Sequence, residues 1–232
     1  MSKYGKKHKS ALEKVNQKEI LSADKALGKV KELAHAKFDE TVDLNVNLGI
    51  DPTKGEHAVR GSVVLPHGTG KRARVIVFAK GEYAEAAKKA GADEIGAEDL
   101  VEKINGGWLD FEYAVATPDL MGLVGKLAKI LGPRGLLPNK KVGTVTFDVG
   151  ATVSDLKKGR LFFKNDKSGL VHFSLGKVSF DKQKLVDNYA AFIKVLAASK
   201  PASSKGKFLR KITVSSTMGV GIGVNPDEAA KL

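Results

Sequence analysis

The chain has 232 residues, of which 42% are hydrophobic and 28% charged, a balance typical of globular proteins that argues against wholesale disorder. It contains no cysteine, which excludes disulfides, thiolate metal sites and cysteine nucleophiles. With 39 Lys and Arg against 26 Asp and Glu, the net charge is +13, which favours a polyanionic partner. We expect nucleic acid first and an anionic membrane surface second; charge that serves only solubility is the competing, less favoured interpretation.

Nothing in the sequence indicates a membrane segment. No apolar run approaches the roughly 18 residues that a membrane span requires. The Lys-rich N-terminus also lacks the apolar centre of a signal peptide. We therefore expect a protein that is cytoplasmic, or released into a similar space, and that does not span a membrane; no membrane partner is expected once nucleic acid is preferred over an anionic membrane surface.

The first part of the chain predicts an antiparallel α+β unit. Residues 2–20 form a basic arm, expected to be helical from about Ser10. A helix follows over 22–37, with one apolar face. Strict alternation over 41–50 predicts a half-buried strand, and 59–65 predicts a strand beside it.

The periodicity changes in the middle of the chain. Continuous apolar runs at 75–79 and 111–116 predict strands buried on both faces. The other elements expected here are helices over 82–90, 98–105 and 120–131, the last ended by Gly132 and Pro133, and a short strand near 93–95. Strands that alternate with helices imply a parallel sheet, so residues 69–158 are expected to form a small wound α/β unit.

The last part returns to the antiparallel pattern. Residues 160–164 and 170–175 flank the polar segment 165–169, which predicts a β-hairpin. An amphipathic helix is expected over 181–199, and a final strand over 208–218.

The two ends therefore resemble each other, whereas the middle differs. The economical interpretation is a discontinuous α+β domain, residues 1–68 and 159–232, with residues 69–158 inserted as an α/β domain. The ends carry 25 basic and 14 acidic residues, and the middle carries 14 and 12, so most of the net charge lies on the ends. Two consecutive domains remain the alternative, because the pattern alone does not show that the ends pair.

No motif indicates catalysis. The five histidines lack metal-ligand spacing. The Gly-Lys steps at 70–71 and 125–126 lack both the earlier glycine and the following Ser or Thr of a phosphate loop. The glycine-spaced segment 219–223 lacks the spacing of a dinucleotide fingerprint, and indicates close backbone packing or backbone approach to a partner. Enzyme activity is therefore possible but unsupported, and we expect a protein that is no enzyme and holds no cofactor and no metal.

Two stretches are candidates for recognition. Residues 125–141 hold five basic groups and no acid, in what is expected to be a rigid loop after a helix. A basic helix end that complements the helix dipole would explain Lys129 but not the length of the loop. The candidate residues of this loop are Lys126, Lys129, Gly132, Pro133, Arg134, Gly135, Pro138 and Asn139.

The second stretch is 213–219. The hydroxyls of Thr213, Ser215 and Thr217 are expected to share one strand face, followed by Met218 and Gly219. Such a surface can hydrogen-bond phosphates, 2′-hydroxyls and base edges. An ordinary Ser/Thr-rich exposed strand is the competing interpretation, and composition alone slightly favours it.

Both stretches, in this order and at this separation, resemble the ribosomal protein L-one family in its bacterial form. The sequence Gly-Pro-Arg-Gly-Leu-Leu-Pro-Asn at 132–139 is the most specific match. The resemblance runs almost end to end and includes residues 36–42, 48–52, 59–61, 65–68 and 116–119.

The resemblance implies a discontinuous α+β domain that binds RNA and an inserted Rossmann-like α/β domain. It implies a protein of the mobile stalk of the large ribosomal subunit, monomeric when free, that binds 23S rRNA, assists release of deacylated tRNA from the exit site and represses translation of its own operon mRNA. The loop 132–139 would order its domain or touch RNA or tRNA. The implied RNA-binding residues are Phe38, Thr41, Lys167, Ser168, Gly169, His172, Thr213, Ser215, Thr217, Met218 and Gly219.

Two rivals remain at this point. An RNA-modifying enzyme with a Rossmann-like domain is disfavoured by the missing glycine fingerprint. A general nucleic-acid chaperone or membrane-surface protein, driven by charge alone, would show no selectivity against competitor RNA.

Overall fold

The computed structural model describes residues 5–16, 19–53, 57–204 and 206–229. The chain divides into two compact units. Unit 1 consists of the chain up to Gly70 together with the part from Phe162 onward, and unit 2 is the segment Lys71–Leu161.

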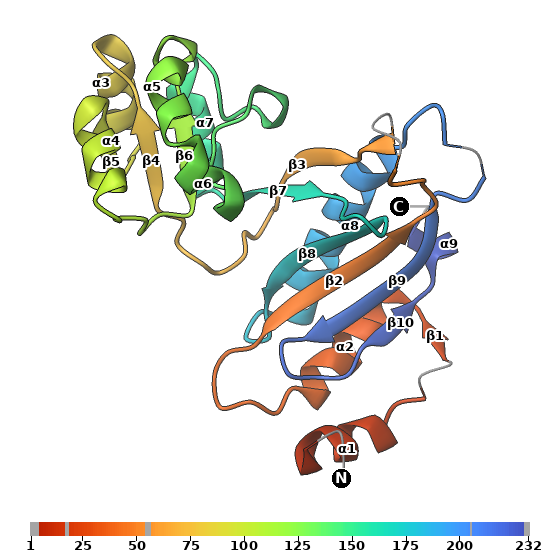
Figure 1. Cartoon of the computed structure of the whole chain (residues 1–232). Helices are drawn as coiled ribbons and strands as arrows, with labels where there is room; N and C mark the ends of the chain where they lie inside the picture. Colours follow the sequence, from red (N-terminus) through yellow and green to blue (C-terminus); the bar gives the residue numbers. More distant parts are fainter. Residues whose placement is uncertain (1–4, 17–18, 54–56, 205, 230–232) are drawn as a thin grey trace. The chain divides into compact units, whose positions relative to one another are not determined.

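Unit 1 is a mixed α/β unit whose central element is a five-stranded sheet in the order β1-β10-β9-β2-β8 (Figure 1). Its elements are α1 (Lys6–Glu13), β1 (Ile20–Leu21), α2 (Ala23–Leu33), β2 (Thr41–Leu48), β3 (Arg60–Val64), β7 (Arg160–Lys164, which crosses the boundary), β8 (Leu170–Lys177), α8 (Lys182–Ala198), β9 (Leu209–Ser216), β10 (Ile222–Val224) and α9 (Pro226–Ala229).

The sheet joins the two ends of the chain. β2 pairs antiparallel with β8 on one side and with β9 on the other, and β1 pairs parallel with β10. Burial alternates along β2 as the sequence predicts, because Val42, Leu44, Val46 and Leu48 are buried and the residues between them are half-exposed. The strand ends at Leu48 rather than at Ile50.

Helix α8 confirms the predicted amphipathic helix. Its apolar face is fully buried through Leu185, Tyr189, Phe192, Ile193 and Leu196. The ring of Phe192 stacks on that of Phe173 in β8, with centroids 3.9 Å apart. Full burial of each such side chain contributes about 1.5–3 kcal/mol, so this helix anchors the sheet.

Two predicted strand pairings in unit 1 are wrong. β3 pairs with β7 and not with β2, and β7 forms no hairpin with β8; one isolated bridge joins Asn165, just after β7, to Val171 of β8. β2 has two edges, and the longer β8 and β9 occupy both. Short β3 therefore takes β7 as its partner.

The first two helices also have different ends from those predicted. α1 begins at Lys6, four residues before Ser10. α2 ends at Leu33 rather than Lys37, because the next residues turn away and donate their amides to the carboxylate of Glu40.

Unit 2 is a three-stranded parallel sheet, β5-β4-β6, with helices on both faces. Its elements are β4 (Val75–Phe78), α3 (Glu82–Lys89), β5 (Glu94–Gly96), α4 (Glu98–Asn105), β6 (Tyr113–Ala116), a 3₁₀ turn (Pro118–Leu120), α5 (Met121–Lys126), α6 (Ala128–Arg134), a second 3₁₀ turn (Lys140–Val142) and α7 (Val149–Lys157). All four residues of β4 are buried, as expected for a central parallel strand.

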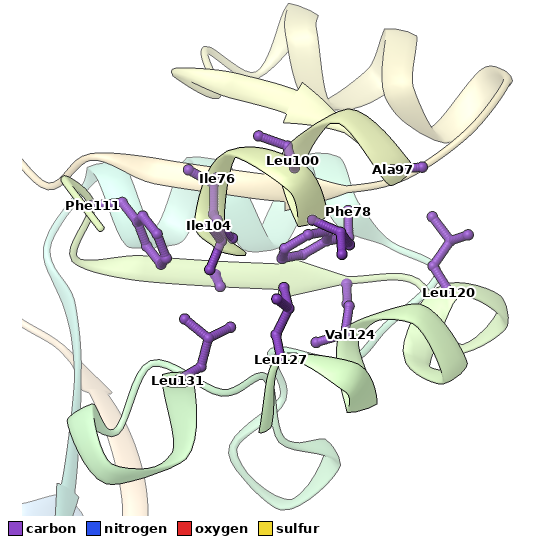
Figure 2. Close-up of a cluster of buried hydrophobic side chains, with 13 residues drawn as sticks. Ile76, Phe78, Ala97, Leu100, Ile104, Phe111, Leu120, Val124, Leu127 and Leu131 are labelled. Atoms are coloured by element: carbon purple, nitrogen blue, oxygen red, sulfur yellow. The ribbon is translucent and has the colours of Figure 1, made fainter. Parts of the chain in front are cut away.

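The core on one face of this sheet is shown in Figure 2. Ile76 and Phe78 of β4 point into a cluster with Ile104 of α4 and with Leu127 and Leu131 near α5 and α6. These side chains are almost completely buried, so the helices that follow β5 and β6 are fixed to the sheet by apolar contact.

The helix predicted over 120–131 differs from the structure. A 3₁₀ turn, α5 and α6 replace it, with the break at Leu127. Gly132 and Pro133 do not end α6, which runs to Arg134 and stops at Gly135, where the backbone is left-handed (φ +72°). Helix α7 was not predicted.

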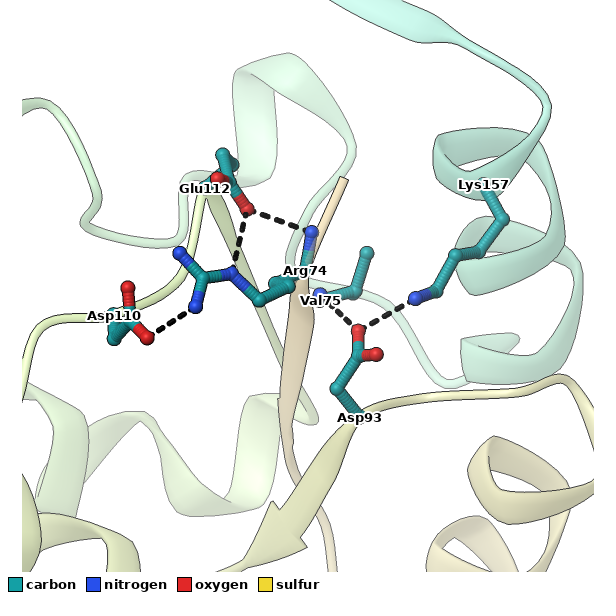
Figure 3. A network of polar contacts seen from close by, with 6 residues as sticks. All are labelled: Arg74, Val75, Asp93, Asp110, Glu112 and Lys157. Carbon is teal, nitrogen blue, oxygen red and sulfur yellow. Dashed lines mark hydrogen bonds and ion pairs between the residues drawn. The ribbon is translucent and has the colours of Figure 1, made fainter. Parts of the chain in front are cut away.

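Polar groups hold the amino ends of the three parallel strands together (Figure 3). Asp93 accepts the amide of Val75 at 2.7 Å and pairs with Lys157 at 2.5 Å. The amide of Arg74 donates to Glu112 at 2.7 Å, and its guanidinium pairs with Asp110. Burial raises the pKa of Asp93, but the hydrogen bonds from Lys157 and Val75 outweigh burial and lower it.

Candidate nucleic-acid interface

One face of the unit 1 sheet carries polar side chains that remain accessible. Helices α2 and α8 pack behind the sheet, α2 against β9 and β10 and α8 against β8, on the side to which the buried residues of β2 belong (Figure 1). The opposite face, here called the open face, presents half-exposed and exposed polar residues from three neighbouring strands. They are Thr41, Asp43 and Asn45 of β2, His172 and Ser174 of β8, and Thr213 and Ser215 of β9.

The strand register brings these side chains into two rows. Asn45 lies between His172 and Thr213, and Asp43 lies between Ser174 and Ser215. The ring Nδ1 of His172 and Oδ1 of Asn45 are 2.6 Å apart, and the hydroxyl of Ser174 donates to Asp43 at 2.8 Å. Because neighbouring strands are about 4.8 Å apart, the rows form a dense grid of donors and acceptors.

Five of the expected RNA-binding residues lie at one end of the open face, in the segment that leads into β2 and in the turn after β9, which hydrogen bonds join. This edge cluster consists of Phe38, Thr41, Thr217, Met218 and Gly219. The hydroxyl of Thr217 accepts the amide of Thr41 at 2.9 Å and donates to the carbonyl of Thr41 at 3.3 Å. Phe38 and Met218 are 57% and 55% exposed, which is unusual for large apolar side chains in a region whose backbone is fixed by hydrogen bonds.

The structure corrects the expected position of Thr217. β9 ends at Ser216, so Thr217 lies in the following turn and not on the strand face with Thr213 and Ser215. Gly219 closes this turn by donating its amide to the carbonyl of Ser216 at 3.1 Å. A Cβ at Gly219 would lie 2.3 Å from the Ser216 hydroxyl, so the segment packs closely, as the glycine pattern suggests.

A buried carboxylate, not selected from the sequence, lies beneath the edge cluster. Glu40 is 2% exposed, and accepts the amides of His35 at 3.0 Å, Ala36 at 2.8 Å and Met218 at 3.0 Å. Burial raises the pKa of Glu40, but the adjacent Ser216 hydroxyl and these three amides outweigh burial and lower the pKa to about 2. Glu40 therefore stays ionised at neutral pH.

Lys167, Ser168 and Gly169 lie at the far end of the open face. They belong to a tight turn in which Asp166 accepts the amides of Ser168 and Leu170 at 2.8 and 2.7 Å. Gly169 is left-handed (φ +77°), and its carbonyl accepts the amide of Leu48, the last residue of β2. An eight-residue strand spans roughly 24 Å, so this turn and the edge cluster lie at opposite ends of one face.

The basic stretch of unit 2 is mostly helical rather than a loop. Its apolar side is anchored, since Leu127 and Leu131 are fully buried and Pro138 is buried. The backbone of Asn139 is held by the hydroxyl of Thr144, which accepts its amide at 2.8 Å. Of the candidate residues in this stretch, the exposed ones are Lys126, Lys129, Gly132, Pro133, Arg134, Gly135 and Asn139.

Sequence reasoning also missed Asp43, Asn45 and Ser174 as members of the open face. The alternation over 41–50 had already assigned Asp43 and Asn45 to the polar side of the strand, so that signal was present. Ser174 required knowledge that β8 pairs with β2.

The fold and these surfaces define a class of protein: a mixed α/β protein whose first unit exposes one polar sheet face. Within the described ranges there is no group of three or more His, Asp or Glu side chains that could hold a metal. Over the same ranges, no helix is long and apolar enough to cross a membrane.

Comparisons with known proteins identify the family. The model of the ribosomal protein L1p/L10e family matches residues 30–220. The large ribosomal subunit protein uL1 of Cutibacterium acnes is 54% identical over 224 residues, which cover 97% of each chain. The protein of that name from Thermus thermophilus is 52% identical over 227 residues, which cover 97% of this chain and 99% of the relative. The chain belongs to the ribosomal protein L1p/L10e family, which confirms the resemblance and the expectation that it is no enzyme.

Proposed function

We propose that this protein is a cytoplasmic constituent of the large ribosomal subunit and that it binds 23S rRNA in the mobile stalk. The names of its relatives support the first half of the proposal. The observation that carries the second half is the open face with its edge cluster, in which hydrogen bonds fix the polar side chains and two large apolar side chains are exposed.

The chemistry of this surface suits folded RNA. Hydroxyl and amide side chains on the open face pair with ribose and phosphate oxygens, and Phe38 and Met218 contact bases or sugars. The lysines of unit 1, including Lys167, supply attraction that does not depend on sequence. Residues 1–68 and 159–232 are accordingly the proposed RNA-binding domain, and 69–158 the inserted Rossmann-like domain.

Two further activities belong to the proposal. Exposed Lys126, Lys129 and Arg134 give unit 2 a basic surface for phosphates, which fits a part in moving deacylated tRNA out of the exit site. The free protein, a monomer, represses its own operon mRNA through the same face that binds rRNA. Repression is then competition, in which the tighter ribosomal site fills first.

Replacing Met218 by Ala tests the role of the edge cluster. The side chain is exposed, so the fold is retained, whereas affinity for full-length 23S rRNA in excess unrelated RNA is expected to fall about tenfold, or about 1.4 kcal/mol. Filter binding at fixed salt measures this change.

Phe147→Ala is the matched control, because it removes a comparably exposed apolar side chain from unit 2 and is expected to leave the affinity unchanged. Wild-type affinity in a folded Met218→Ala variant contradicts the proposed interface. Equal binding of 23S rRNA and competitor by the wild-type protein would favour a charge-driven chaperone instead.

A further inference from the structure

The edge cluster is assembled from two chain segments that are far apart in sequence. Phe38 lies in the connection between α2 and β2, and Met218 lies in the turn between β9 and β10. Neither side chain is held by burial, since both are more than half exposed. Their positions depend on what fixes the backbone on either side of them.

Glu40 connects these two segments. Its Oε1 accepts the amides of His35 and Ala36, which precede Phe38, and its Oε2 accepts the amide of Met218 itself. The backbone carbonyl of Glu40 accepts the amide of Val178 at 2.9 Å, so the residue is also tied to the end of β8. One carboxylate therefore links the segment of Phe38 directly to the turn of Met218.

Other contacts hold the Phe38 segment from its outer side but do not reach Met218. The carboxylate of Asp39 accepts the amide and hydroxyl of Ser179 at 3.1 and 2.8 Å. The ammonium of Lys177 donates to the carbonyl of Asp39 and to the hydroxyl of Thr41, each at 3.1 Å. The spacing between this segment and Met218 is therefore fixed by Glu40 and by the Thr41–Thr217 pair, and not by these contacts.

The burial of Glu40 makes this arrangement compatible with an RNA partner. The charge of Glu40 is met by three amide donors away from solvent, so it repels phosphates less than an exposed carboxylate would. Hydrogen bonds to a charged acceptor are stronger than those to a neutral one. A surface fixed before binding loses less conformational freedom when the partner arrives.

We propose that Glu40 is a positioning residue for RNA binding: its carboxylate holds Phe38 and Met218 at the spacing that RNA requires, without touching the RNA. The inference rests on the proposed function of the open face. It adds a residue that strengthens RNA binding through its position, although its negative charge by itself weakens binding to RNA.

Glu40→Gln in the full-length protein tests the proposal. Glutamine keeps the size of the side chain, but its NH₂ group cannot accept an amide, so one of the two segments is released. Affinity for 23S rRNA in excess competitor is expected to fall at least tenfold, although loss of a negative charge by itself favours binding to a polyanion. The amide proton of Met218 or those of His35 and Ala36 should shift upfield in a ¹H–¹⁵N spectrum.

Asp93→Asn is the matched control. It makes the same change in charge and weakens a comparable carboxylate–amide contact, but in unit 2, so we expect RNA affinity equal to that of the wild-type protein or slightly higher. Glu40→Asp keeps the charge and both acceptor oxygens but is shorter by one methylene. It is expected to bind with an intermediate affinity, which charge alone would not produce.

The outcomes separate this inference from the proposed function. If folded Glu40→Gln and Glu40→Asp bind as tightly as the wild-type protein while Met218→Ala binds weakly, the positioning role is wrong and the interface stands. If wild-type protein does not prefer 23S rRNA to competitor, the proposed function itself is wrong.

Discussion

The two sheets of this protein use the same strand-forming residues in different ways. In unit 1, β2 is antiparallel to both neighbours, has helices behind one face and alternates between buried and half-exposed residues. In unit 2, β4 is parallel to both neighbours and buried along its whole length. A parallel sheet covered on both faces has no surface to offer a partner, whereas the antiparallel sheet keeps one. Strand direction therefore decides which of the two sheets keeps a face open to solvent.

The largest expected effect tests whether the units are independent. Phe78→Ala removes an almost fully buried ring from the core in Figure 2 and should destabilise unit 2 by about 3–5 kcal/mol. The single tryptophan of the chain, Trp108, packs against this core, so its fluorescence follows unit 2. Urea unfolding is expected to show an early tryptophan transition, while affinity for 23S rRNA is retained.

Tyr83→Ala, an exposed aromatic residue of the same unit, is the control and should leave the tryptophan transition nearly unchanged. If Phe78→Ala lost RNA binding in the absence of urea, RNA binding by the open face would depend on an intact unit 2.

A smaller effect is expected from Asn188→Ala in unit 1. This fully buried amide accepts the amide of His67 at 3.2 Å and donates to the carbonyls of Gly68 and Leu175. Its removal leaves these groups without a partner and should cost about 2–3 kcal/mol. Circular dichroism is expected to show the loss while the tryptophan transition stays in place. A shift of both transitions would mean that the units unfold together; Gln183→Ala, on the exposed side of α8, should shift neither.

The smallest predicted effect concerns acid. The pKa of Glu40 is about 2 in the folded protein against 4.5 ordinarily, so its contribution is present above pH 4.5 and is lost as the pH falls toward 2. Between pH 6 and pH 3 the stability difference in unit 1 between wild type and Glu40→Gln should shrink by about 2 kcal/mol, measured by urea unfolding followed by circular dichroism. A difference that does not change with pH would show that Glu40 is not held as an ion. Asp93, whose pKa is also lowered, should give unit 2 its own acid sensitivity in tryptophan fluorescence.

The sequence predicted most elements because their periodicity depends on local pattern. β2, β4 and α8 each bury the residues that their spacing indicates. Strand partners were predicted less well. β3 was expected beside β2, but β8 and β9 pair with both edges of β2, and no local pattern encodes that choice. The residues of the edge cluster were predicted together only through the family resemblance. Glu40 could not be found at all, because its sequence neighbours Asp39 and Thr41 are polar and its burial arises from a turn 178 residues away.

The pairing of β2 with β9 has a consequence for the order of events during synthesis. Residues 71–161 of unit 2 are continuous in the chain, so that unit can fold while the remainder is still being made. β2 cannot pair with its second neighbour until residues 209–216, which form β9, have been synthesised. The open face and its edge cluster therefore arise only after almost the whole chain has emerged, and an unfinished chain has no complete surface with which to hold RNA.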